Sequence, residues 1–180
     1  DRDADTFCNY LDEFVDQNLT DDYWNITFPA KIDSASAKTP RLSAYWAALN
    51  ILNAEVLFSD LKVSQLLDPI VTPIKDMERH HLFPRAYLTK LGITEQYKRN
   101  QIANMSFVDW TENLEINEKP PSDYWSVMTN SMPQSQLDKQ MHWHALPPNW
   151  EQMEYDDFLS LRRRLIASVA KEGFAALKRT

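Results

Sequence analysis

The chain has 180 residues, of which 43% are hydrophobic and 12% aromatic, so it can bury the core of one compact domain. No apolar run approaches the roughly 18 residues that a membrane span needs, and we expect no membrane partner. Two Gly against ten Pro argue against a Gly-rich nucleotide-binding fold. A single cysteine excludes an internal disulfide framework and a thiolate zinc cluster.

The start of the chain and its cysteine content predict where the protein works. It opens with Asp1-Arg2-Asp3, without a Met and without a secretory signal, so we expect a piece of a longer protein. One cysteine fits a reducing compartment, and we therefore expect a cytoplasmic location.

The net charge of −7 lies entirely in the first third of the chain. Residues 1–60 contain 11 acidic and 4 basic side chains, whereas residues 73–119 and 120–180 each contain seven of either sign. An acidic protein usually avoids nucleic acid, but a neutral surface does not repel DNA. Any phosphate contact must therefore come from a few well-placed side chains or from a metal ion.

Hydrophobic residues at helical spacing predict two amphipathic helices in the first third, over about residues 5–17 and 41–58. Between them, residues 24–28 are typical of a short extended piece or turn, and residues 33–40 of a loop. Cys8 falls on the face of the first helix that we expect to be buried.

The middle of the chain predicts two short strands. Residues 74–84 have no helical stripe and end at Pro84, and residues 105–110 favour a second strand. Residues 131–153 are expected to be irregular. Further helices are expected over residues 61–67, 85–91 (closed by Gly92), 95–103, 112–118 and 123–130, with a final helix from about Asp156.

Residues that carry chemistry gather in this middle part. His80 and His81 are adjacent and are followed by Leu-Phe-Pro, Asn104 opens the second expected strand, and Asn113 lies on the helix after it. The pattern resembles the HNH, or ββα-metal, nucleases. The stretches ERHHLFPRAYL, NQIANMSFVDWTEN and EKPPSDYW resemble, more specifically, the C-terminal domain of modification-dependent (type IV) restriction enzymes of the GmrSD type.

The resemblance implies a catalytic pair. His81 would be the general base, because a neutral imidazole with a pKa near 6.5 can take a proton from water at cellular pH. Asn104 would tie the intervening loop to the first strand and so aim His81. Arg85 and Lys119 are candidate contacts for the substrate phosphate.

The resemblance also implies a divalent metal ion held by His80 and Asn113, at the scissile phosphate and the leaving 3′ oxygen. Mg²⁺ or Mn²⁺ is the usual ion, but many HNH nucleases have Asp where this chain has His80, and an imidazole ligand favours Mn²⁺, Ni²⁺, Co²⁺ or Zn²⁺ over Mg²⁺. Glu78 or Asp76 could supply a carboxylate, so the metal stays open. Neighbours on a strand point to opposite faces, so a turn or bulge would be needed to bring His80 and His81 together.

Three other interpretations stay open. The same fold could be catalytically inactive and bind DNA or a partner. A zinc hydrolase could use His80 and His81 with His142 and His144. Residues 1–60 could be an acidic docking surface for another domain, which is compatible with the nuclease. The run Arg162-Arg163-Arg164 is expected to be a solvated helix face, with a contact to the phosphate backbone as the alternative.

Together these observations predict an α+β fold, mostly helical, with a small ββα-metal (HNH) core in a helical scaffold. The expected segments are an acidic helical scaffold (1–70), the HNH-like core (71–130) and an irregular segment with a C-terminal helix that packs on it (131–180), forming one compact domain. The expected function is metal-dependent DNA cleavage within a bacterial restriction or phage-defence protein. Its expected partners are DNA and an N-terminal nucleotide-dependent domain.

Overall fold

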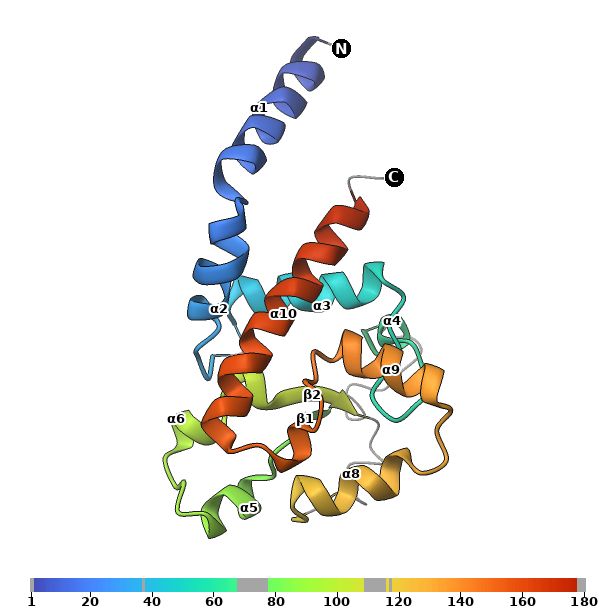
Figure 1. Cartoon of the computed structure of the whole chain (residues 1–180). Helices are drawn as coiled ribbons and strands as arrows, with labels where there is room; N and C mark the ends of the chain where they lie inside the picture. Colours follow the sequence, from blue (N-terminus) through green and yellow to red (C-terminus); the bar gives the residue numbers. More distant parts are fainter. Residues whose placement is uncertain (1, 37, 68–77, 109–115, 117, 178–180) are drawn as a thin grey trace.

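The computed structural model describes residues 2–36, 38–67, 78–108, 116 and 118–177. These residues form a mostly helical chain with one small antiparallel sheet, which confirms the predicted α+β class (Figure 1). The described helices are α1 (Arg2–Asn18), a π-helical turn (Tyr23–Thr27), α2 (Phe28–Lys31), α3 (Pro40–Ile51), α4 (Val63–Leu67), α5 (Arg85–Lys90), α6 (Gln96–Arg99), α8 (Pro121–Thr129), α9 (Gln134–Trp143) and α10 (Tyr155–Leu177), with 3₁₀ turns at Ile102–Asn104 and Trp150–Gln152.

The sheet pairs the two strands expected from the sequence. β1 (Glu78–His81) runs antiparallel to β2 (Met105–Val108), with His80 opposite Ser106 and His81 opposite Met105. Each strand is described over four residues, and the expected strand residues 74–77 and 109–110 lie outside the described part of the chain. The two strands lie in the middle of the molecule, where α10 and α3 cover one side (Figure 1).

The core is built around the crossing of α10 over α3 (Figure 1). One buried hydrophobic cluster takes in Leu49 from the first predicted segment, Leu82 from the second and Phe158 from the third. The two helices approach closely where Gly173 meets Ala48, because a Cβ at Gly173 would overlap the Ala48 Cβ and lie 2.6 Å from its Cα.

We expect Gly173→Ala to lower the free energy of unfolding by about 1–3 kcal/mol, although Ala is normally the better helix former, because the added methyl forces α10 away from α3. Urea unfolding measures this change. Ala48→Gly in the same chain should recover part of the loss. A Gly173→Ala protein as stable as the wild type would refute the close crossing.

The structure corrects three expectations. Residues 24–28 are helical, not extended. Pro29 does not prevent this, since it stands at the start of α2, where its missing N–H and fixed φ cost nothing. Residues 131–153 are not all irregular, since α9 begins directly after Pro133. α9 was hard to foresee because most of its residues are polar. α3 ends at Ile51, short of the predicted residue 58.

α1 is helical as predicted, but the expected burial of its apolar face is wrong. Phe7, Tyr10 and Phe14 are each more than half exposed, and Cys8 is exposed as well. Figure 1 shows why: α1 extends away from the body, and none of the other described helices covers it. Within the described ranges, no helix is both long and apolar enough to cross a bilayer.

Candidate functional site

His81 is the last residue of β1, and its half-buried side chain faces the end of α6. The His81 Nε2 lies 3.0 Å from the Oδ1 of Asn100, the residue that follows α6. The chain bends immediately after His81, at Leu82 and Phe83, and then enters α5. The imidazole is therefore held between the end of a strand and the end of a short helix.

Asn104 is fully buried and joins the two chain segments around His81. Its Oδ1 accepts a hydrogen bond from the Phe83 N–H (2.8 Å), and its Nδ2 donates to the Phe83 carbonyl (3.0 Å) and to the Arg99 carbonyl (3.1 Å). One side chain thus links the backbone two residues after His81 to the backbone just before Asn100. These bonds are the kind of loop contact expected from the sequence; the catalytic role of Asn104 stays a prediction.

Two arginines surround His81 with positive charge. Burial is the main cause that lowers the His81 pKa. The Asn100 hydrogen bond, the next largest effect, raises this pKa, and the charges of Arg85 and Arg99 lower it further. Arg85 is exposed at the start of α5, and Arg99 ends α6 with its Nη1 donating to the Thr89 hydroxyl (2.9 Å). The cluster therefore combines a neutral proton acceptor with cations that attract an anion.

His80 lies on the other side of β1. The pairing with β2 continues without a bulge through His81, and the bend comes only after it, so the two imidazoles leave the strand on opposite faces. The His80 ring is 6% exposed and stands edge-on to the Tyr124 ring of α8, at 6.3 Å between centroids. The turn or bulge that would bring the two rings together is therefore not present between His80 and His81.

The metal site implied by the sequence is only partly within the described residues. Asn113 and Asp76 lie outside them, and the structure does not describe the side chain of Glu78. In the described part, no group of three His, Cys, Asp or Glu side chains could hold a metal ion. A pair of one imidazole and one amide suits a borderline divalent ion such as Zn²⁺, Ni²⁺ or Co²⁺ better than Mg²⁺, so by its chemistry the predicted donor set fits an ion of that class.

The structure brings some of the predicted site residues together. His81, Arg85 and Asn104 lie around one loop. Lys119 is exposed in the turn before α8, and within the described residues no hydrogen bond or ion pair joins it to His81. Its contact with a phosphate stays a prediction.

The histidines of the alternative zinc site are scattered. His142 is exposed on α9, and its Nε2 lies 2.7 Å from the Glu172 carboxylate of α10. His144, just after α9, is 1% exposed and faces the core. These two therefore do not form the shared face that a zinc hydrolase would need with His80 and His81.

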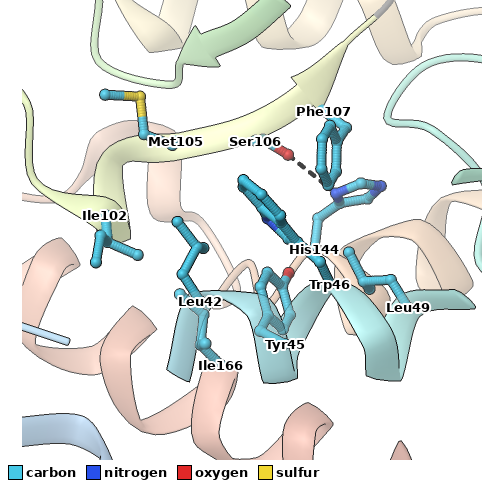
Figure 2. Close-up of a pocket in the computed structure, with 10 residues that line it drawn as sticks. All are labelled: Leu42, Tyr45, Trp46, Leu49, Ile102, Met105, Ser106, Phe107, His144 and Ile166. Carbon is cyan, nitrogen blue, oxygen red and sulfur yellow. Dashed lines mark hydrogen bonds between the residues drawn. The ribbon is translucent and has the colours of Figure 1, made fainter. Parts of the chain in front are cut away.

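His144 hydrogen bonds Ser106 beneath β2, in a pairing that looks like a catalytic dyad but is structural (Figure 2). The His144 Nε2 is 2.8 Å from the Glu55 carbonyl, so Nε2 carries the proton and Nδ1 accepts from the Ser106 hydroxyl (2.9 Å). The cavity beside them has a volume of about 10 Å³, room for one water at most. A cavity of this size leaves no room for a substrate beside the serine.

Burial lowers the pKa of His144 to about 4, with Arg162 adding to the shift, and this predicts an acid-sensitive fold. Between pH 6.5 and 4 the unfolded chain binds a proton that the folded chain does not, so stability falls as the pH falls. The full effect is about 3 kcal/mol, from roughly 1.4 kcal/mol per pKa unit. Urea midpoints at neutral and acid pH measure it. His144→Gln keeps one donor and one acceptor and should flatten the profile; an equal acid loss in both proteins would contradict this origin.

Arg162 corrects the expectation of a solvated arginine run. Its side chain is fully buried, with Nη1 donating to the carbonyls of Ala103 and Met105 (both 2.8 Å), and Nε and Nη2 donating to the His144 carbonyl (3.1 and 3.0 Å). The guanidinium thus holds the backbone on both sides of Asn104. Arg163 pairs with Asp33, and Arg164 is exposed.

Asn100 and Arg99 belong to the site but were not singled out from the sequence. A signal that could have identified them is their place in the short connection between a helix and the strand that follows Asn104.

Comparisons with protein-family models, with curated proteins and with solved structures give no match for this chain.

Proposed function

We propose that this chain is a metal-dependent DNA endonuclease domain of the HNH type, acting in the cytoplasm as part of a bacterial restriction or phage-defence protein. The observation that carries the proposal is the cluster at the end of β1: a neutral imidazole between two arginines, on a loop clamped by a buried asparagine. The sequence resemblance supplies the reaction class, and the preceding nucleotide-dependent domain that it implies is part of the same proposal.

The chemistry follows from what each side chain can do. A DNA phosphate enters between Arg85 and Arg99, whose guanidinium groups donate hydrogen bonds to its oxygens. A water oxygen attacks phosphorus while His81 takes one of its protons. The bond from phosphorus to the 3′ oxygen breaks, and the 3′ oxygen takes a proton from solvent, leaving a 3′-hydroxyl and a 5′-phosphate.

Asn104 serves this reaction by holding Phe83 and Arg99 in place, so that the imidazole and the arginines keep their mutual positions. A divalent ion, when bound, would supply positive charge to the scissile phosphate and the leaving oxygen. Asn113 lies outside the described residues, and His80 leaves β1 on the face opposite His81, so their role as ligands of this ion stays a prediction.

A plasmid assay tests the proposal. Purified protein with Mg²⁺ or Mn²⁺ should convert supercoiled plasmid to nicked or linear DNA, EDTA should stop the conversion, and DNA ligase should reseal the nicks because their ends are 5′-phosphate and 3′-hydroxyl. No conversion with Mg²⁺, Mn²⁺, Zn²⁺, Ni²⁺ or Co²⁺ would refute the nuclease. DNA binding without cleavage would then favour the alternative of an inactive binding module.

A further inference from the structure

The hydrogen bond between His81 and Asn100 determines which imidazole nitrogen is free. The Asn100 atom at 3.0 Å from Nε2 is the amide oxygen, which can only accept. Nε2 must therefore carry the proton when the ring is neutral, and Nδ1 is left with its lone pair. Nothing else in the described chain hydrogen bonds Nδ1.

Asn100 is itself held in a fixed place. Its backbone N–H donates to the Gln96 carbonyl (3.0 Å), which makes it the C-cap of α6. The preceding Arg99 carbonyl accepts from Asn104 (3.1 Å), and the Arg99 guanidinium reaches Thr89 of α5. These hydrogen bonds fix the position of the segment that carries the Asn100 amide oxygen.

From this geometry we infer that Asn100 is a positioning residue of the site, which fixes the His81 tautomer and presents Nδ1 as the atom that takes the proton from water. The inference rests on the proposed function for its catalytic meaning. Two asparagines therefore have different roles at this site. Asn104 fixes the backbone around His81, and Asn100 fixes the tautomer of the His81 ring.

The tautomer can be read without any cleavage assay. In a long-range ¹H–¹⁵N spectrum of the protein at about pH 8, where the ring is neutral, the wild type should show His81 with a protonated Nε2 and an unprotonated Nδ1. Asn100→Ala should move both nitrogen shifts toward the averaged values of two exchanging tautomers. Asn100→Asp keeps an acceptor and should hold the wild-type tautomer.

The rate of DNA cleavage should depend on the tautomer of His81. We expect Asn100→Ala to lower the single-turnover rate by about 10–100-fold with DNA affinity unchanged, and Asn100→Asp to recover most of the rate. Gln96→Ala, an exposed neighbour on α6, is the matched control and should behave as the wild type.

Failure of the inference differs from failure of the function. A wild type protonated on Nδ1, an Asn100→Ala spectrum unchanged at His81, or an active wild type whose rate Asn100→Ala leaves unchanged would each overturn the role of Asn100. A wild type inactive with every metal would refute the nuclease, and the spectra would still decide whether Asn100 sets the ring.

Discussion

His81→Ala is expected to lower the rate of DNA cleavage by about 10²–10⁴-fold, the usual contribution of a general base. The reason is local: the described cluster around β1 offers no second neutral imidazole on the same face, because His80 leaves the strand on the opposite side. Single-turnover cleavage of a supercoiled plasmid measures the loss.

Controls separate this chemical effect from a loss of binding or folding. His142→Ala removes an exposed imidazole that pairs with Glu172 on another surface, and it should retain the wild-type rate. The DNA affinity of His81→Ala should stay close to that of the wild type, because Arg85 and Arg99 remain. If both histidine variants cut at the same rate as the wild type, His81 does not take part in the reaction.

Arg162→Met is expected to lower the free energy of unfolding by about 3–5 kcal/mol. Met fills much of the same volume but leaves the carbonyls of Ala103, Met105 and His144 buried without their donor, and an unsatisfied buried polar group costs about 1–3 kcal/mol. The substitution also removes the cost of burying the charged guanidinium. The total loss of stability is therefore smaller than the sum of the costs of the three unsatisfied carbonyls.

The neighbour in the same arginine run provides the control. Arg164→Met changes an exposed side chain on α10 and should alter stability by no more than about 0.5 kcal/mol. Urea unfolding of the two variants measures the difference. Equal stabilities would mean that Arg162 does not hold the backbone around Asn104.

The sequence predicted the two strands and the place of His81 because these depend on local patterns. A stretch without helical periodicity that ends at Pro84 indicates a strand and a turn, and an asparagine before a second apolar run indicates a residue that can bond backbone. The helix ending before Gly92 was predicted for the same reason, and Gly92 has a positive φ of 83°.

What could not be predicted depends on contacts between distant segments. Arg162 is buried because α10 packs against the turn Ile102–Asn104 that leads into β2, and nothing in three consecutive arginines indicates which of them faces the core. The exposure of the apolar face of α1 could not be predicted from the sequence either, since an amphipathic pattern is the same whether or not another element covers it. Asn100 contacts His81 across 19 residues, so only the fold reveals the pair.

Chemical rescue tests the central claim, that the proton acceptor stands at position 81, most directly. His81→Gly leaves a space at the end of β1 that free imidazole can enter. The expected result is a protein that cuts plasmid slowly with metal ion alone and faster as imidazole is added, while the wild-type rate does not change. A His81→Gly protein that cuts at the wild-type rate without imidazole would contradict the claim.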